Sequence, residues 1–363
     1  MRDGWYLPTR LFDGMVLQVG AGLRIADGKV AEIGPAPTGA IPLDGTLTPG
    51  FVDLQVNGGG GALFNNIPHA DGLRQIAAAH RKTGTVAILP TLITDSHDVM
   101  RAAVAAMLEV WGAPGIAGIH FEGPHISVAK RGTHAAAHVR PFDDVTRQAI
   151  ATLRKAGIPV MITLAPEVVA PDEIAALCDL GAVVSVGHSN ADAGQVDAAL
   201  AAGATCATHL FNAMSGMTAR APGVAGAVLS GSCAAGLICD GIHVDDRMLR
   251  LALAARAEGL FLVSDAMATV EGPDHFQLYG QTIRLQNGRL INAEGHLAGA
   301  HLTQAMGLRR LVSTLGVPLE RGLRMTITTP ARLMDLPGLA QLQGRAITDC
   351  LLLSETLDVT RLG

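Results

Sequence analysis

Eight short apolar runs alternate with segments of helical periodicity through the middle of the chain, and this repeat limits the folds open to it. The intervening segments, such as residues 144–157 and 190–204, are alanine-rich and amphipathic, and several end in glycine, which is typical of a helix C-terminus. Strands that alternate with helices form parallel sheets, and eight such units predict an α/β fold of the TIM-like (β/α)8 barrel class. The runs cover residues 51–56, 85–93, 115–122, 160–167, 182–189, 205–210, 236–244 and 260–266.

The two ends of the chain show a different pattern, in which polar and apolar residues alternate. Residues 11–34 alternate around Asp27-Gly28, a dipeptide that favours a tight hairpin turn, and the tail over residues 343–363 has a similar β-like pattern. We expect both ends to pair in one small discontinuous β-sandwich domain of residues 1–48 and 335–363, with the barrel over residues 49–334. A further hairpin is indicated at Asn287-Gly288.

Composition and charge exclude several classes of partner. The formal net charge is −5 and basic residues form no run, which disfavours nucleic acid. No apolar run reaches the length of a membrane span, and the N-terminus lacks the pattern of a signal peptide. The five cysteines include no CxxC pair, so we expect reduced thiols and a cytoplasmic protein.

Polar or ionisable residues end seven of the eight apolar runs, at the edge where a barrel of this class builds its active site. The clearest case is Glu122, which ends the run GIAGIHFE, because a buried carboxylate is costly without a compensating partner. That partner could be an arginine, a set of hydrogen-bond donors or a metal ion. The seven endings are Asn57, Glu122, Glu167, His188, His209, His243 and Asp265.

Two of these endings, His188 and His209, follow successive predicted strands, and neighbouring strands lie about 4.8 Å apart. Together with Glu122 they form a His2Glu set, and three protein ligands with one open position are typical of a catalytic zinc site. The same donors also suit Fe, Co or Mn. A lone histidine is more often a hydrogen-bonded core residue, but three donors at strand ends favour a metal. Gln55 stands where barrels with two metals often have histidine, which favours a single ion.

Four further residues have both a chemical and an ordinary interpretation. Asp265 ends the run LFLVSDA and could exchange a proton with the attacking water as general base and acid, or it could cap a helix. His134 could polarise a carbonyl group from its loop, although by itself it is more often a surface histidine. Arg220 and His243 could hold a phosphate, although a lone arginine is more often an exposed charge.

Several motifs occur together and resemble the N-acetylglucosamine-6-phosphate deacetylase family of the amidohydrolase superfamily. The motifs are HFEGPHISVAKRGTH, GHSNA, ATHLFNAM, PGVAGA, DGIHVD, SDA and LAGAHLT, and the match runs from about residue 49 to Pro330. The resemblance implies deacetylation of an amino-sugar phosphate by one divalent ion per subunit, most often zinc. It implies that Glu122, His188 and His209 bind this ion, with Gln55 near it.

The resemblance also assigns the residues around the substrate. Asp265 is the implied general base and acid, and His134 the implied contact to the acetamide carbonyl. Arg220 and His243 match residues that hold the phosphate in the active site of the neighbouring subunit, which implies a homodimer. The other implied substrate contacts are Thr133, Asn212, Ala213, Leu297, Ala298 and Gly299.

Two departures from the family pattern leave the sugar preference open. His125 follows the EGP motif where the family usually has an apolar or aromatic residue, and Ala300 follows LAG where serine is frequent. The alternatives are a deacetylase of N-acetylgalactosamine 6-phosphate or another N-acyl substrate, a non-catalytic regulator that binds a sugar phosphate, and a sugar isomerase that needs no metal.

Overall fold

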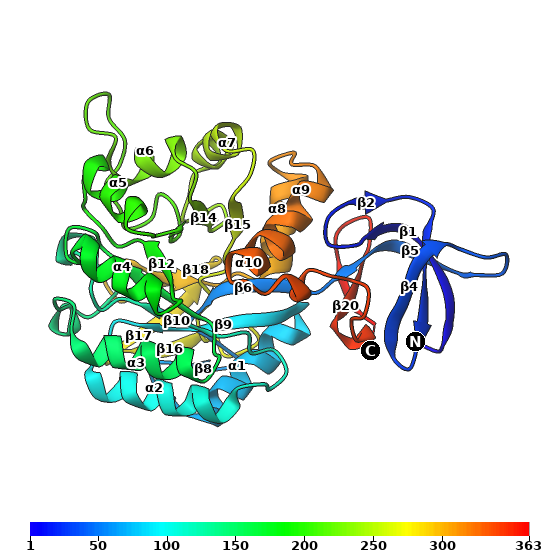
Figure 1. Cartoon of the computed structure of the whole chain (residues 1–363), viewed down its shortest axis with the longest axis horizontal. Coiled ribbons are helices and arrows are strands. Elements are labelled where there is room, and N and C mark those ends of the chain that lie inside the picture. The colour runs from blue at the N-terminus through cyan, green and yellow to red at the C-terminus, as the bar shows by residue number, and fades with distance from the viewer. Residues whose placement is uncertain (363) are drawn as a thin grey trace.

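A closed parallel barrel forms the centre of the protein, seen here in a computed structural model that describes residues 1–362 (Figure 1). Its strands are neighbours in chain order, and a parallel bridge between Val56 and Ala266 closes the ring. Each predicted apolar run overlaps one of the strands, so the predicted barrel is confirmed. The strands are β6 (Phe51–Val56), β9 (Thr85–Ile93), β10 (Ile119–Glu122), β11 (Val160–Leu164), β12 (Val183–Val186), β13 (Cys206–Ala207), β14 (Ala234–Leu237) and β15 (Leu260–Leu262).

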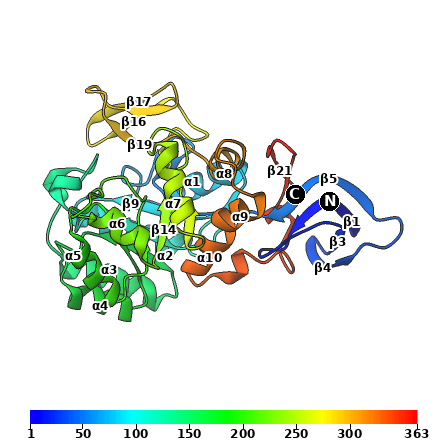
Figure 2. The same cartoon turned by 90° about the horizontal axis from the view of Figure 1, so that it is seen from above.

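Helices surround the barrel and bury their apolar faces against it (Figures 1 and 2). Capping side chains start several of them: Asp143, for example, accepts a hydrogen bond from the Thr146 N–H, which satisfies a donor that the first turn leaves free. The helices are α1 (Ala70–Lys82), α2 (His97–Val110), α3 (Asp144–Lys155), α4 (Pro171–Asp179), α5 (Ala193–Ala201), α6 (Gly223–Ser230), α7 (Asp246–Ala255), α8 (Gln304–Ser313), α9 (Leu319–Leu323) and α10 (Thr329–Leu333). No helix among residues 1–362 has the length and apolar character that a membrane span needs.

A separate sheet-rich region combines the two ends of the chain, as the alternating patterns predict. Its order is β21-β20-β5-β1-β3-β4, with β2 paired to β1, and Cys350 of β20 stands opposite Pro49 of β5. Figure 1 shows this sheet beside the barrel, with both chain termini in it. The division of the chain after residues 48 and 334 stays a prediction. The strands are β1 (Gly4–Phe12), β2 (Leu17–Gln18), β3 (Ala21–Ala26), β4 (Lys29–Pro35), β5 (Ile41–Pro49), β20 (Cys350–Leu353) and β21 (Val359–Arg361).

A third sheet is inserted between β15 and α8 and lies over one end of the barrel (Figure 2). It consists of β16 (His275–Leu278), β17 (Gln281–Gln286), β18 (Arg289–Ile291) and β19 (Leu297–Ala300), all antiparallel. The predicted hairpin at Asn287-Gly288 joins β17 to β18 and is confirmed. A bridge from Ala300 to Ala266 ties β19 to the barrel, just after β15. A two-strand hairpin, β7 (Gly58–Gly59) and β8 (Ala62–Leu63), follows β6.

One buried carboxyl group of the barrel makes stability depend on pH. Asp53, on β6, is fully buried; its Oδ1 accepts hydrogen bonds from the backbone N–H groups of Gln55 and Ser264, whereas its Oδ2 has no partner among the described residues. Burial raises the pKa of Asp53 to about 7. The native state therefore keeps a proton that the unfolded chain loses near pH 4, so this group lowers stability as pH rises from about 4 to 7.

An Asp53→Asn substitution is expected to remove this pH dependence. From the difference between about 7 and the usual 3.8, the aspartate costs roughly 4 kcal/mol of stability at neutral pH, as an order of magnitude. An asparagine carries no charge, so the variant should unfold at a higher temperature than the parent protein at pH 7.5 and lose that advantage near pH 4. Thermal unfolding followed by circular dichroism at both pH values measures this. An equal rise in unfolding temperature at both pH values would contradict the raised pKa of Asp53.

Candidate functional site

A cavity of about 220 Å³ opens at the end of the barrel where the loops that follow the strands converge. This is the end at which barrel enzymes of this class bind substrates. Polar and apolar side chains share the wall, and no lysine or arginine of the described chain lines it. The lining residues are Ile93, Glu122, Gly132, Thr133, His134, His188, His209, Asn212, Ala213, Ile238, His243, Asp265, Met267, Leu297 and Gly299.

Glu122 stands at the centre of the polar part of this wall. It ends β10, is only 2% exposed, and its Oε1 lies 3.0 Å from the Nε2 atoms of both His188 and His209. Those two Nε2 atoms are also 3.0 Å apart, and the Gln55 amide donates to the same Oε1 at 2.9 Å. Burial alone would raise the pKa of Glu122, but its close contacts with His188 and His209 hold the pKa well below its usual range.

These donors fit a divalent metal ion. Zinc bonds of about 2.0–2.1 Å in a tetrahedral site place ligand atoms about 3.3 Å apart, close to the separations among Glu122, His188 and His209. The Nδ1 atom of His188 lies 2.9 Å from the Lys130 carbonyl, so an Nδ1–H donated there leaves the Nε2 lone pair directed at Glu122. The carboxylate lies among imidazoles without a lysine or arginine in hydrogen-bond reach in the described chain. A cation would satisfy all three donors at once.

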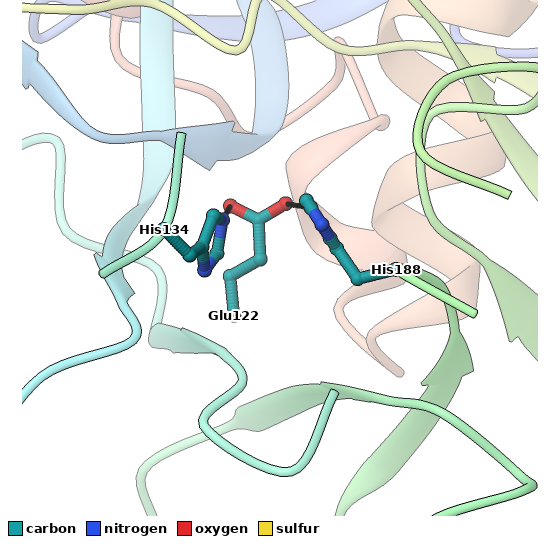
Figure 3. Close-up of side chains that lie close together, drawn as sticks. All are labelled: Glu122, His134 and His188. Atoms are coloured by element: carbon teal, nitrogen blue, oxygen red, sulfur yellow. Dashed lines mark hydrogen bonds and ion pairs between the residues drawn. The ribbon is translucent and has the colours of Figure 1, made fainter. Parts of the chain in front are cut away.

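His134 forms a second possible set of ligands with Glu122 and His188, since one ligand atom from each of the three lies within 4.8 Å of the others. Figure 3 shows Glu122 between the two rings, with one carboxylate oxygen toward each. The His134 Nε2 is 4.0 Å from the Glu122 Oε2, whereas the His209 Nε2 is 3.0 Å from Oε1. The shorter distances favour His209 as the third ligand. His134 is 2% exposed, so the interpretation as a surface histidine is wrong.

Asp265 follows β15 and lies beside the same cluster. Its Oδ1 accepts hydrogen bonds from the Asn57 amide at 2.6 Å and the Gln55 amide at 3.3 Å, and its backbone N–H donates to the Gln55 carbonyl. Burial, and then the negative charge of Glu122, raise the pKa of Asp265 to about 6. A carboxyl group with a pKa near neutrality can both accept and return a proton. Asp265 starts no helix, so the role of helix cap is excluded.

Three of these residues hold a left-handed backbone conformation, which non-glycine residues rarely adopt. The φ angles are +48° for His188, +27° for His209 and +50° for Asp265, and each residue lies in the loop that follows its strand. Such conformations cost of order 1–3 kcal/mol each and persist where the surroundings enforce them, most often at functional sites. The turn they make directs the three side chains into the cavity.

The residues matched to the substrate are mostly brought together. Five of them line the cavity: Thr133, Asn212, Ala213, Leu297 and Gly299. Ala298 does not line it and is buried beside Gly299 in β19.

The two residues matched to the phosphate are separated in the structure. His243 lines the cavity of its own chain, with its Nδ1 2.6 Å from the Asp240 Oδ2, and its expected place in a neighbouring subunit's site stays a prediction. The loop that carries His243 follows β14, at the same end of the barrel as the cavity. Arg220 is exposed on the loop before α6 and lies outside the cavity.

The two departures from the family pattern do not touch the cavity. His125 is buried behind it, with Nδ1 3.1 Å from the Arg140 carbonyl and Nε2 2.9 Å from the Thr146 hydroxyl. The backbone of Ala300 pairs with that of Asp265 and Met267. Glu167, another polar strand ending, lies after β11 and accepts a hydrogen bond from the hydroxyl of Ser189 in the loop after β12, so its role is structural.

Some residues of the site were not predicted from the sequence. Asn57 was noted as the polar ending of the first run, but its hydrogen bond to Asp265 was not predicted. Ile93, Ile238 and Met267 line the cavity as ordinary apolar residues, and apolar side chains carry no distinguishing pattern. Thr94, which contacts His134, follows the one run without a polar ending noted from the sequence.

Comparisons with known proteins identify chains of similar sequence and structure. A deacetylase of N-acetylgalactosamine 6-phosphate from Shewanella sp. (strain ANA-3) is 43% identical over 82% of this chain and 76% of its own length. An N-acetylglucosamine-6-phosphate deacetylase from Haemophilus influenzae is 34% identical over 80% of this chain and 77% of its own. A solved N-acetyl-D-glucosamine-6-phosphate deacetylase from Mycobacterium smegmatis, an aspartate-to-alanine variant in complex with that sugar phosphate, superposes with a TM-score of 0.91. It is 31% identical, with 99% of this chain and 97% of that chain covered.

The family model of the amidohydrolases matches residues 46–337. This range contains the whole barrel, the inserted sheet and every residue of the cavity. The chain therefore belongs to the amidohydrolase family.

Proposed function

We propose that this protein hydrolyses the acetamide of N-acetylglucosamine 6-phosphate to glucosamine 6-phosphate and acetate. The observation that carries the proposal is the cluster of Glu122, His188 and His209 beside Asp265 in one cavity. Relatives named deacetylases of N-acetylhexosamine 6-phosphates, at 43% and 34% identity, support it. The complete set also argues against a non-catalytic regulator, because a protein that only binds the sugar phosphate needs no proton acceptor beside a metal site.

We assign the metal to Glu122, His188 and His209, and propose zinc, with Fe, Co or Mn as alternatives. When bound, such an ion lowers the pKa of a water molecule towards 7 and polarises a carbonyl group. Gln55 donates to Glu122 and to Asp265, so it orients both carboxylates without entering the ligand set. Loss of activity on chelation distinguishes this proposal from an isomerase that needs no metal.

The residues of the chain then account for the proton transfers. Asp265 accepts a proton as the water oxygen attacks the acetamide carbon, and an N–H of His134 stabilises the negative charge that develops on the carbonyl oxygen. Asp265 next gives its proton to the amide nitrogen, the C–N bond breaks, and acetate and the amine leave. Asp265 thus accepts the proton in the first step and returns it in the second, and its pKa of about 6 suits both transfers.

N-acetylgalactosamine 6-phosphate is the second candidate substrate. A relative named for that substrate has the higher identity, 43%, against 34% for one named for the glucosamine epimer. The metal cluster contacts the amide and not the sugar hydroxyl groups, so it does not decide between the epimers. Values of kcat/KM for the two sugar phosphates, measured side by side, rank them; a ratio in favour of the galactosamine epimer would replace the first substrate by the second.

We further propose that Arg220 binds the phosphate in the cavity of a second copy of the chain, within a homodimer. Arg220 lies outside its own cavity, and that cavity has no lysine or arginine among its described lining residues, although the substrate carries a phosphate. His243 is the one proposed phosphate ligand from the same chain. We also propose a cytoplasmic location, because all five cysteines are free thiols in the structure.

Replacing Arg220 with alanine is expected to raise KM for the phosphorylated sugar by about ten- to a hundredfold, with a smaller change in kcat. Hydrogen bonds to charged groups contribute about 1.5–3 kcal/mol, which sets this range. Steady-state kinetics on the parent protein and the variant measure the change. Arg101→Ala, another exposed arginine, paired with Asp98 on α2, is the matched control. An unchanged KM in Arg220→Ala would remove the phosphate role.

A further inference from the structure

His134 receives two contacts on one ring nitrogen, and both come from Thr94. The Thr94 hydroxyl lies 2.8 Å from the His134 Nδ1, and the Thr94 backbone N–H donates to the same nitrogen at 3.4 Å. Thr94 directly follows Ile93, the last residue of β9. Both residues are buried, with 1% of Thr94 and 2% of His134 exposed, so water has little access to this contact.

The backbone contact decides which nitrogen of His134 carries the hydrogen. A hydroxyl can donate or accept, but a backbone N–H can only donate. The Thr94 N–H therefore needs a lone pair on Nδ1, which places the imidazole hydrogen on Nε2. The Thr94 hydroxyl is consistent with this, because His134 Nδ1 is its nearest acceptor and the Glu122 carbonyl, its other acceptor, lies farther away at 3.3 Å.

The Nε2 atom faces the reaction cavity, 4.0 Å from the Glu122 Oε2. An Nε2–H directed there is a hydrogen-bond donor and has no lone pair for a metal. We infer that Thr94 fixes His134 as a donor to the substrate carbonyl and thereby keeps it out of the metal ligand set. The donor role toward a substrate carbonyl rests on the proposed function. The tautomer of His134 follows from its contacts with Thr94 and does not depend on any substrate.

Two neighbours hold Thr94 in the position that this role requires. Gly123, directly after Glu122, has a φ of +85°, and a Cβ atom there would lie 2.2 Å from the Thr94 hydroxyl oxygen. Any side chain at position 123 would therefore displace the hydroxyl. On the other side, the Tyr279 hydroxyl donates a hydrogen bond to the Thr94 carbonyl.

Tyr279 connects this contact to the inserted sheet. It lies in the turn between β16 and β17, in a left-handed conformation with a φ of +48°, and reaches across to the end of β9. The same sheet supplies Leu297 and Gly299 to the wall of the cavity. The sheet that closes one side of the substrate cavity thus also supports the residue that orients His134. Thr94 and Tyr279 are positioning residues, because neither lines the cavity.

Imidazole ¹⁵N NMR of histidine-labelled, zinc-loaded protein tests the tautomer directly. The His134 signals are assigned by their absence from the spectrum of His134→Gln. We expect a protonated Nε2 and an unprotonated Nδ1 for His134, and the reverse tautomer for His188, whose Nδ1 faces the Lys130 carbonyl. A protonated Nδ1 on His134, or loss of bound zinc in His134→Gln, would overturn the inference. Neither result depends on the sugar or on turnover, so a failure here is distinct from a wrong substrate.

Substitutions of Thr94 and Tyr279 test the positioning role. Thr94→Val loses the hydroxyl and is expected to lower kcat about ten- to a hundredfold, with KM within about twofold and zinc content unchanged. Thr94→Ser keeps the hydroxyl and should restore most of kcat. Tyr279→Phe should lower kcat by a smaller factor and broaden the His134 signals, whereas Tyr6→Phe, in the remote terminal sheet, serves as its control. Full kcat in Thr94→Val would contradict the role of the hydroxyl.

Discussion

Asp265→Asn is expected to lower kcat by about a thousandfold or more while the metal stays bound. Asparagine has nearly the shape of aspartate and can still accept the hydrogen bond from the Asn57 amide through its carbonyl oxygen. It cannot take a proton from water or return one to the amine, and general acid–base catalysis contributes about 10²–10⁴-fold to rates. Because Asp265 serves both proton transfers, the effect should lie in the upper part of that range. Steady-state kinetics and metal analysis of the same preparation measure both quantities.

The matched control is Asp274→Asn, an exposed aspartate at the start of the inserted sheet whose partner is His275. That variant should retain normal turnover. Turnover close to that of the parent protein in Asp265→Asn would refute the assignment of the general base. A parallel loss of metal and activity would instead make Asp265 a ligand.

Glu122→Gln is expected to abolish stable metal binding and, with it, activity. The Glu122 carboxylate lies 3.0 Å from both His188 and His209 and supplies the negative charge of the proposed ligand set. The neutral amide of glutamine lacks that charge and is a much weaker ligand for a divalent ion. Dialysed variant should contain well under a tenth of an ion per subunit. In the metal-free state it should unfold at a lower temperature than the metal-free parent protein at neutral pH, because the lowered pKa of Glu122 means that its carboxylate, beside His188 and His209, stabilises the fold.

Glu167→Gln is the matched control for this experiment. Glu167 follows the next strand of the barrel, but it accepts hydrogen bonds from Ser189 and Asn190 and does not line the cavity. Its variant should keep both metal and activity. One tightly bound ion per subunit in Glu122→Gln would show that the ion sits elsewhere.

The fold could be predicted from local patterns because each unit of the barrel has its own signal. Apolar runs such as residues 85–93 are long enough to be strands buried on both faces, and the segments between them have helical periodicity and glycine ends. The Asn287-Gly288 hairpin likewise depends on two residues only. The inserted sheet as a whole was not predicted, because β16 and β19 are only four residues long, and β19 is additionally held by a bridge to the barrel.

The site could be predicted as far as it depends on which residues end the strands. Glu122, His188, His209 and Asp265 each follow an apolar run, and parallel strands bring these ends together. The motif around His243 does not tell which subunit's cavity its loop enters, so its assignment to a neighbouring subunit stays a prediction, although it lines the cavity of its own chain. Thr94 and Tyr279 are 185 positions apart, and only the docking of the inserted sheet on the barrel brings them into contact.

Release of acetate from N-acetylglucosamine 6-phosphate is the measurement that tests the central claim most directly. The metal-loaded protein is assayed before chelation, after chelation and after the ion is restored, with N-acetylgalactosamine 6-phosphate in parallel. We expect acetate with the loaded protein, none after chelation, and recovery on adding zinc. No acetate from either sugar phosphate, with one bound ion per subunit confirmed, would contradict the proposed function while leaving the metal site in place.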